Sequence, residues 1–532
     1  MSARLPKRFN TAGPCVPEEH YMLPVLPRLP GVKDMIEGKL YFTIRAPAQS
    51  GKTTFLAHLT KAVNDSGEMY ALYCSLAALS HVEDRAEALV AIASEINGAM
   101  RASDIGTISQ KAFKYDASPG MSSPDSKIAI MLNMLCQDLD RGLAVFFDDM
   151  DLLTGPGFLS FLAQIRDGFN CRHRPRNNFP ASLALAGMRD IRDYVVSGRP
   201  GAREAPLGSP FNIVAERMAL ANFTLEETGR LYRQHTEATG RVFEDGAVER
   251  AWRWSEGQPW LVNALARRIV EVKLKDDRSA RVTATHVDEA AETLIKRRDT
   301  HIRSLPERLK EPRVENVMES VLAGTFAAVS PHDDDSRYCR DLGLLELTEE
   351  KRLRPSNPIC REVAVRTLTD RIDKFIPVTP CQTWTDGENP LLSGLLAEFQ
   401  AFWRENADAG AERFLLPKIF RHDEANHVII LFSFLQRALD GGAAVYHEYA
   451  EGRGAADLCA VRKGREYRIE IKIDADEPLE DSLAQLSGYL DTAGEKEGWL
   501  VIFDQERKMP LDDKFYIKTK QFKNKTIHIF GC

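Results

Sequence analysis

The stretch Tyr41-Phe-Thr-Ile-Arg-Ala-Pro-Ala-Gln-Ser-Gly51-Lys52-Thr53 decides how the first part of this chain folds. Its opening run, residues 41–45, has the composition of a buried strand, and the residues from Lys52 onward favour a helix. A phosphate group binds best where backbone N–H groups point at it above the positive end of a helix dipole. A loop between a strand and a helix provides both, so the stretch predicts a phosphate-binding loop.

The residue types in this loop suit contact with phosphate. Gly51 permits close approach of the backbone, Lys52 reaches the terminal phosphates, and the Thr53 hydroxyl can ligate Mg²⁺. At the first position of the pattern GxxxxGK(S/T), Ala46 replaces glycine, which is acceptable where the backbone needs no positive φ. The alternative is a chance Gly-Lys-Thr at a loop–helix junction. The predicted nucleotide-binding residues are Ala48, Gln49, Ser50, Gly51, Lys52, Thr53 and Thr54.

A second apolar run, residues 143–147, ends in two aspartates. Asp148 would hold Mg²⁺ through water and Thr53, and Asp149 would orient or deprotonate the attacking water. Asp149 is one methylene shorter than the glutamate usual at this position, which predicts slow hydrolysis. The alternative is an acidic cap on the next helix.

Apolar runs alternate with amphipathic stretches from residue 41 to about residue 215, which is typical of a parallel sheet wrapped by helices. Before them, the proline-rich residues 1–35 predict an extended strap. After them, residues 222–300 predict helices only, the first opening at Thr224 with Glu226 and Glu227 in its first turn. The predicted strands are residues 41–45, 70–74, 143–147 and 183–187.

These features resemble the AAA+ and STAND class of P-loop ATPases, specifically a bacterial group with a strap like Asn10-Thr-Ala-Gly-Pro14. The resemblance covers roughly residues 8 to 370 and implies ATP and Mg²⁺ as cofactors. It implies that Arg189, which ends a predicted strand, senses the γ-phosphate; the alternative is an ion pair with Asp190 or Asp193.

Two further segments match the same class. The element Gly257-Gln-Pro259 implies that Pro259 approaches the nucleotide base, although alone it would be a turn. Residues 311–371 read as helix, loop, short helix, two-stranded ribbon and helix, and within them residues 335–358 match a winged-helix segment. Such a segment binds DNA in some relatives and only packs against neighbours in others.

Near the C-terminus, a predicted strand at residues 467–473 carries charge on one face. Side chains alternate along a strand, so Glu470 and Lys472 face away from the isoleucines. Asp457, on the preceding strand, would lie close to them across the turn. Asp457 and Glu470 could hold one or two Mg²⁺ ions that activate water, while Lys472 orients that water or steadies a pentavalent phosphorus. The alternative is a solvated face of an edge hairpin.

The order helix, three strands, helix, strand from residue 424 onward, with these residues, resembles the PD-(D/E)XK nuclease superfamily over about residues 395 to 532. The resemblance implies Glu424 as an auxiliary metal-binding acid, with Asp423 as the alternative. It also implies that Gln485 and Tyr489, one helical turn apart, contact substrate or support the metal site. Ala456 stands where the superfamily usually has proline, and a catalytically dead nuclease fold is a further alternative.

The whole sequence predicts an α/β multidomain protein: a P-loop NTPase parallel sheet with a helical lid and winged helix, then a restriction-endonuclease-like αβββαβ domain. The predicted parts are a strap at 1–35, the P-loop ATPase domain at 36–220, the lid at 221–305, the winged helix at 306–378, a linker at 379–392 and the nuclease-like domain at 393–532.

Composition limits the partners. The formal net charge of -7 argues against a chain coated in basic residues, so nucleic acid would bind at local patches. Residues 507–525, with lysines beside aromatic side chains, are one such patch or a solvated basic face.

The N-terminus lacks the apolar core of a signal peptide, and the longest apolar run, residues 428–435, is too short to cross a bilayer. These features predict a cytoplasmic protein with no membrane partner.

Together the two predicted sites indicate an ATP-regulated, metal-dependent nuclease, acting on DNA in preference to RNA. By analogy, such a fusion suits bacterial defence or the control of mobile elements. The alternative is a nucleotide-dependent switch or adaptor whose nuclease-like domain binds DNA without cleaving it. A homo-oligomer is compatible with either hypothesis.

Overall fold

The computed structural model places the chain in two compact units. The first comprises Met1–Val287 with Asp341–Gly343, and the second comprises Asp288–Arg340 with Leu344–Cys532. The described residues are 7–80, 82–103, 123–153, 155–175, 177–188, 212–275, 277, 279–297, 304–322, 333–348, 351–370, 391–406, 423–439, 444–450, 455–462, 465–473, 479–503 and 511–532.

The core of the first unit is a five-stranded parallel sheet with the strand order β2-β3-β4-β1-β5. Parallel neighbours require long crossover connections, which helices provide here. The strands are β1 (Tyr41–Arg45), β2 (Met69–Ser75), β3 (Gly142–Asp148), β4 (Ser182–Gly187) and β5 (Val214–Ala219). The helices that flank them are α1 (Val32–Glu37), α2 (Lys52–Ser66), α3 (Arg85–Arg101), α6 (Pro124–Asp138) and α7 (Gly155–Cys171).

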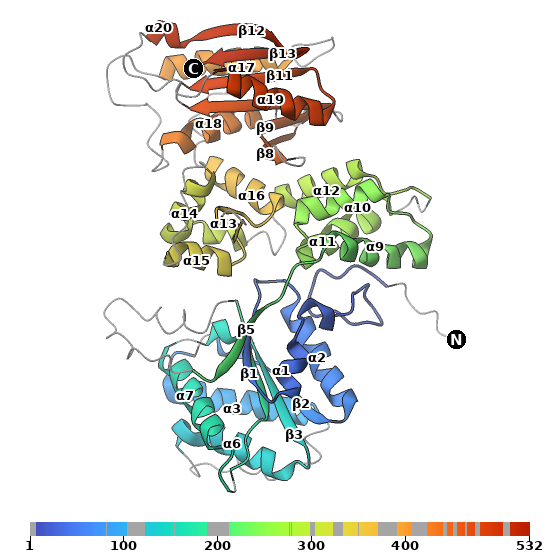
Figure 1. The fold of residues 1–532 in the computed structure, drawn as a ribbon, viewed down its shortest axis with the longest axis vertical. Coiled ribbons are helices and arrows are strands. Elements are labelled where there is room, and N and C mark those ends of the chain that lie inside the picture. The colour runs from blue at the N-terminus through green and yellow to red at the C-terminus, as the bar shows by residue number, and fades with distance from the viewer. Residues whose placement is uncertain are drawn as a thin grey trace. The chain divides into compact units, whose positions relative to one another are not determined.

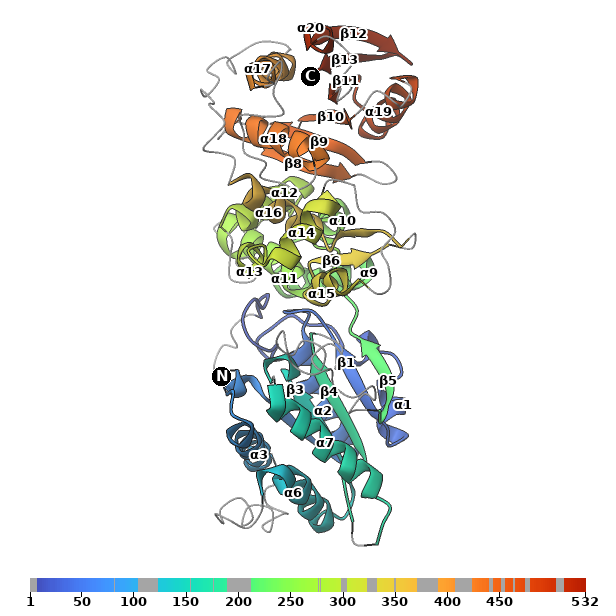
Figure 2. The ribbon, with the colours of Figure 1, turned by 90° about the vertical axis from the view of Figure 1, so that its left-hand side faces the viewer.

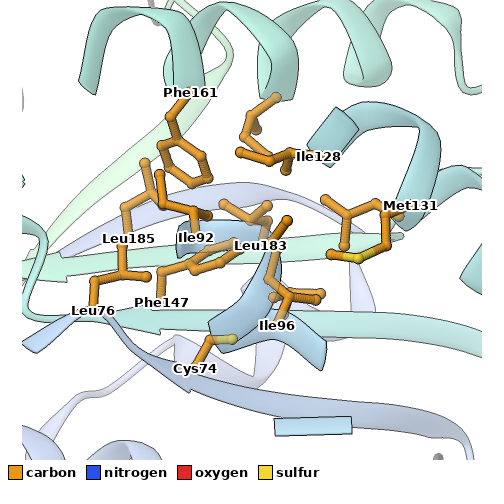
Figure 3. Packing of buried hydrophobic residues seen from close by; sticks show 14 of the residues in the cluster. Cys74, Leu76, Ile92, Ile96, Ile128, Met131, Phe147, Phe161, Leu183 and Leu185 are labelled. Carbon is orange, nitrogen blue, oxygen red and sulfur yellow. The ribbon is translucent and has the colours of Figure 1, made fainter. Parts of the chain in front are cut away.

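Helices cover both faces of this sheet (Figures 1 and 2). Phe146 of β3 lies in a buried cluster with α1 and α2, whereas Phe147 lies in the cluster with α3, α6 and α7. Consecutive strand residues point to opposite faces, so the unbroken apolar run of β3 fits a strand buried on both sides. Figure 3 shows the second cluster, where side chains from three helices converge on the strands: Ile92, Ile128 and Phe161.

The sequence missed two elements of this unit. β5 is an edge strand, and of its six side chains only that of Met218 is buried, so no apolar run marks it. α1 falls inside the segment predicted to be extended. It has six residues between Gly31 and Gly38, too few to show a helical period.

The four predicted strands are confirmed, and their parallel arrangement brings distant segments together. The residues that follow β1, β3 and β4 emerge at the same edge of the sheet. That edge therefore carries the phosphate loop (residues 46–53), the aspartates at 148 and 149, and the end of β4.

Beyond β5 the first unit is helical, as predicted. The helices are α9 (Leu225–Thr239), α10 (Asp245–Ser255), α11 (Pro259–Arg267), η4 (Arg268–Lys273) and α12 (Ala284–Arg297), the last of which continues into the second unit. α9 begins with a capping box: the Glu227 N–H donates to Thr224 Oγ1 at 3.1 Å, and the Thr224 N–H donates to the Glu227 carboxylate at 2.9 Å. This confirms the predicted start of a helix at Thr224.

The strap connects the sheet to the lid. The Cys15 N–H donates to Thr54 Oγ1 of α2 at 3.0 Å, and the indole N–H of Trp260 in α11 donates to the Thr11 carbonyl at 3.0 Å. Phe9 is buried against the rings of Tyr232 and other aromatic residues of the lid. The strap thus contacts both α2 and the lid, which makes the first unit one packed body.

The second unit begins with helices and a short ribbon in the order predicted for residues 311–371. The elements are α13 (Ser304–Arg308), α14 (Pro312–Leu322), α15 (Asp334–Asp341), β6 (Leu345–Leu347), β7 (Leu353–Pro355) and α16 (Pro358–Thr369). The strands β6 and β7 pair antiparallel as a two-stranded sheet.

The rest of the second unit contains a six-stranded mixed sheet with the order β12-β13-β11-β10-β9-β8. The predicted order of helix, three strands, helix and strand is confirmed. The helix α17 and the hairpin of β12 and β13 are additions that the sequence missed. The elements are α17 (Leu391–Asn406), α18 (Asp423–Ala438), β8 (Ala444–Ala450), β9 (Ala455–Arg462), β10 (Arg465–Ile473), α19 (Leu479–Ala493), β11 (Glu497–Phe503), α20 (Leu511–Lys514), β12 (Tyr516–Phe522) and β13 (Lys525–Gly531).

α16 packs against the edge of this sheet. Arg366 of α16 donates two hydrogen bonds to the Glu292 carboxylate, at 2.9 and 3.0 Å, and a longer one to the Val445 carbonyl of β8 at 3.4 Å. Helices α13, α14 and α16 and the C-terminal sheet therefore share one compact unit. Most of the predicted linker, residues 379–392, lies outside the described residues.

Candidate functional sites

The phosphate loop turns directly from β1 into α2. Gly51 caps the helix with a φ of 86°, a conformation that glycine adopts without strain. Gln49 also has a positive φ, whereas Ala46 does not, so alanine in place of the usual glycine causes no strain. The Phe55 N–H makes the first helical hydrogen bond, to the Gly51 carbonyl at 2.9 Å. The N–H groups before it have no partner within the helix and suit an anion.

Asp148, at the end of β3, lies beside Thr53, as predicted, and also beside Lys52. The Thr53 hydroxyl donates to Asp148 Oδ2 at 2.7 Å, and Lys52 Nζ lies 3.6 Å from Asp148 Oδ1. The Tyr73 hydroxyl also donates to this carboxylate, at 3.2 Å. Because Asp148 is fully buried, its negative charge needs these donors for stabilisation. A hydroxyl next to a carboxylate is a donor set that suits Mg²⁺.

Asp149 sits in the left-handed region with a φ of 60°, an unusual conformation for a residue other than glycine. Ser75 Oγ donates to Asp149 Oδ2 at 3.0 Å and holds the side chain. Burial raises the pKa of Asp149 above the ordinary value for aspartate, and the neighbouring Asp148 carboxylate adds to the rise, while Lys52 opposes it. A carboxylate with a raised pKa is suited to accept a proton.

The sequence interpretation missed a third acid, Asp151. Its side chain is largely buried, and Asp151 Oδ1 lies 3.8 Å from Lys52 Nζ. The same oxygen accepts the N–H of Met188, just after β4, at 3.1 Å. Asp151 thereby joins the ends of two strands. The run Asp148-Asp-Met-Asp151 was the signal that could have drawn attention to it.

The lid meets the phosphate loop through Gln258. Its Nε2 donates to the Gln49 carbonyl at 3.3 Å, while its Oε1 accepts the Leu261 N–H at 2.6 Å and caps α11. Pro259 is buried in the first turn of α11. Gln258 thus joins α11 to the phosphate loop, while the approach of Pro259 to a nucleotide base stays a prediction. Arg189 lies outside the described residues.

In the second unit, the structure brings together three predicted charged residues. The Asp457 carboxylate of β9 accepts the N–H of Ile471 in β10 at 2.7 Å, just beyond the last paired residues of that ladder. Glu470 is buried, and its Oε1 lies 3.5 Å from Lys472 Nζ. The strand β10 is flanked by β9 and β11 inside the sheet, so the alternative of a solvated edge hairpin does not describe it.

α19 adds the predicted glutamine and tyrosine to this group. Lys472 Nζ donates to Gln485 Oε1 at 3.1 Å, and Gln485 Nε2 donates to the Tyr489 hydroxyl at 2.5 Å. Burial raises the pKa of Tyr489, with the Glu470 and Asp457 carboxylates contributing to the rise. We call these five residues the C-terminal site: Asp457, Glu470, Lys472, Gln485 and Tyr489.

Asp457 and Glu470 are the residues of the C-terminal site that could hold a metal ion. Two carboxylates provide the hard oxygen donors that Mg²⁺ prefers, with water completing the coordination. Within the described part of the chain, no group of three or more His, Cys, Asp or Glu residues is arranged to hold a metal ion. The backbone of Glu424 and Asp423 begins α18, but their side chains lie outside the described set.

The described part of the predicted basic patch, residues 511–525, contains α20, β12 and the turn into β13. Four of the seven residues of β12 are exposed lysine, threonine and glutamine side chains at the sheet edge, beside the exposed Ile517. Lysine on an edge strand also prevents edge-to-edge pairing, which is a sufficient structural reason for it. No helix among the described residues is long and apolar enough to span a membrane.

Comparison with solved structures finds P-loop ATPases. One is the Walker-type ATPase PABY2304 of Pyrococcus abyssi, with a TM-score of 0.46 and 13% identity over 67% of this chain and 99% of that one. Another is the Thermotoga maritima RuvB Holliday junction branch migration motor, with a TM-score of 0.32 and 18% identity over 61% of this chain and 89% of that one. The sequence matches no protein-family model and no curated protein. The first unit has the α/β fold of a P-loop NTPase, an assignment that rests on its own sheet order and phosphate loop.

Proposed function

We propose that the first unit binds ATP with Mg²⁺ and hydrolyses it slowly. The observation that carries this proposal is the contact of the Thr53 hydroxyl and Lys52 ammonium with the buried Asp148 carboxylate. Lys52 and the N–H groups at the start of α2 would hold the phosphates, and Thr53 with Asp148 would hold the ion. Bound Mg²⁺ would neutralise charge on the phosphates, and Asp149 would accept a proton from water.

Nucleotide titration of the full chain tests this proposal. Lys52→Ala should weaken the binding of ATP with Mg²⁺ by about a hundredfold, since a charged hydrogen-bonding partner of the phosphates is lost. Lys61→Ala is the matched control, because Lys61 lies on the same helix but pairs with Asp65 at the surface. Equal affinity in the wild type and Lys52→Ala would refute the proposal.

We further propose that the second unit is a metal-dependent nuclease that acts on DNA. Support comes from the chain of contacts from Glu470 through Lys472 to Gln485 and Tyr489, with Asp457 on the adjoining strand. Asp457 and Glu470 would hold Mg²⁺, which lowers the pKa of bound water and stabilises charge on a phosphodiester. Lys472 would orient that water.

Cleavage of supercoiled and linear DNA with Mg²⁺, with and without ATP, tests the nuclease. Asp457→Ala should abolish cleavage, whereas Asp491→Asn, which alters an exposed carboxylate near the end of α19, should not. A dependence of the rate on ATP would establish regulation by the first unit. Parallel assays with RNA decide the substrate class.

The alternative function is a nucleotide-dependent switch that binds DNA without cleaving it. It would be favoured if the full chain retained DNA with Mg²⁺ and left it intact under every nucleotide condition. A cytoplasmic location, a homo-oligomeric state and a role in defence or mobile-element control belong to the proposal in both forms.

A further inference from the structure

Arg28 of the strap is a buried cation behind the phosphate loop. It is 7% exposed, and its Nη2 donates to the Ser50 carbonyl at 3.0 Å and to the Ala221 carbonyl at 2.6 Å. The guanidinium carbon lies 4.8 Å from the centre of the Phe223 ring. Arg28 Nη1 would lie only 3.2 Å from a Cβ atom at Gly51, so the guanidinium packs directly against the loop.

Among the described residues, Arg28 forms no ion pair, and its buried Nε makes no hydrogen bond. Burial lowers the pKa of Arg28 to about 10, against a weaker opposing effect of Glu227 and Cys15. The Glu227 carboxylate is already engaged in the capping box of α9. A buried charge ordinarily requires a counter-ion, and no carboxylate among the described residues forms an ion pair with Arg28.

Another buried arginine in the same unit, Arg241, likewise has a buried Nε without a hydrogen bond and no ion pair among the described residues, but it lies beside the opposite end of a helix. Arg241 is 6% exposed and donates to the carbonyls of Val270, Leu274 and Asp277 at 3.1, 2.6 and 2.7 Å. The first two carbonyls belong to the end of η4, where the helix dipole is negative. Arg28 lies instead beside the N-terminal, positive end of α2. A cation is disfavoured there unless an anion joins it.

The hydrogen bond to Ser50 also sets the direction of a phosphate-binding group. The Ser50–Gly51 peptide is trans, so its carbonyl and the Gly51 N–H point in opposite directions. Because the carbonyl points at Arg28, the Gly51 N–H points away from it. That N–H precedes the first hydrogen-bonded turn of α2, where an anion would accept it.

We infer that Arg28 is a phosphate-positioning residue, which holds the Ser50–Gly51 peptide with its N–H toward the phosphates and supplies a second positive charge behind Lys52. This inference rests on the proposed nucleotide binding of the first unit. The phosphate chain of the nucleotide would then balance the charge of Arg28 from the far side of the Ser50–Gly51 peptide. Arg28 does not touch the reacting atoms and acts through the loop.

Nucleotide titration of the full chain tests the inference with ATP, ADP and adenosine. Arg28→Met should raise the dissociation constants for ATP and ADP at least tenfold and that for adenosine less than threefold, because the lost interaction is with phosphate. The KM for ATP hydrolysis should rise while kcat stays within about threefold. Arg28→Lys keeps the charge but loses the guanidinium group that donates to the two carbonyls. Its dissociation constant for ATP should lie between those of the wild type and Arg28→Met.

Arg241→Met is the matched control for the loss of a buried arginine. It should lower the melting temperature and leave the ATP dissociation constant of the folded protein unchanged. If Arg28→Met does not fold, the same comparison of ATP with adenosine in Arg28→Lys decides the question. The inference is overturned if the variant raises the dissociation constants for ATP and adenosine by the same factor. It is also overturned if the dissociation constant for ATP stays within twofold of the wild type. Absence of ATP binding by the wild type overturns the proposed nucleotide binding itself.

Discussion

The phosphate loop and the C-terminal site both combine a lysine with buried carboxylates, yet they are built differently. The phosphate loop is one short segment whose partners lie at the ends of neighbouring parallel strands, and Lys52 is 10% exposed. The C-terminal site draws on β9, β10 and α19, and its lysine is 20% exposed. A site formed around one turn depends on local backbone geometry, whereas a site formed by three elements depends on how they pack.

The largest effect that separates the two sites should come from Asp149→Asn. If Asp149 accepts the proton of the attacking water, its amide replacement should reduce ATP hydrolysis by about 10²- to 10⁴-fold. ATP binding should remain within a few-fold of the wild type, and DNA cleavage in the absence of nucleotide should not change. Steady-state phosphate release measures the first effect. Retention of wild-type hydrolysis would show that another group activates water.

Lys472→Met should produce the next largest effect, now confined to the C-terminal site. Removal of a positioned ammonium should reduce the rate of DNA cleavage by about 10²- to 10³-fold. Hydrolysis of ATP in the absence of DNA should stay at the wild-type rate, measured in the same preparation. An unchanged cleavage rate would mean that Lys472 only neutralises Glu470.

Gln485→Leu tests how far the C-terminal site depends on packing between elements. It removes the hydrogen bonds to Lys472 and Tyr489 while keeping the size of the side chain. Loss of the side chain that orients Lys472 should reduce the rate of DNA cleavage by about 10- to 100-fold. Cleavage kinetics across a range of Mg²⁺ concentrations would show whether the loss lies in metal affinity. A variant as active as the wild type would contradict the dependence on α19.

The smallest effect should be a shift in pH dependence at the phosphate site. Burial, and then the Asp148 carboxylate, raise the pKa of Asp149. As the pH is lowered, the rate of ATP hydrolysis should therefore begin to fall at a higher pH than it would with an ordinary aspartate. The Asp151 carboxylate adds to this rise, so Asp151→Asn should move the fall to lower pH. A pH–rate profile at saturating ATP measures the shift. A shift to higher pH would contradict the assigned electrostatic role of Asp151.

The two sites also differ in how completely local patterns predict them. The strand, glycine-containing turn and helix around Lys52 are consecutive in sequence, so the loop and the seven nucleotide-binding candidates could be named without a structure. Asp457 and Glu470 are separated along the chain, and their proximity followed from the predicted hairpin and strand alternation. Asp151 and Arg28 escaped prediction because their partners, Met188 and Ser50, lie in other segments.

By itself, the sequence determined the local elements of this protein. Apolar runs set β1 to β4, the Gly-Lys-Thr turn set the phosphate loop, and Thr224 with Glu227 set the start of the lid, because each depends on neighbouring residues. Tertiary structure alone decided that β5 joins β1 and that α16 packs against β8. It also decided that Arg28 lies buried behind the loop. These features arise from the burial of surfaces from distant segments, and no local pattern encodes which surfaces meet.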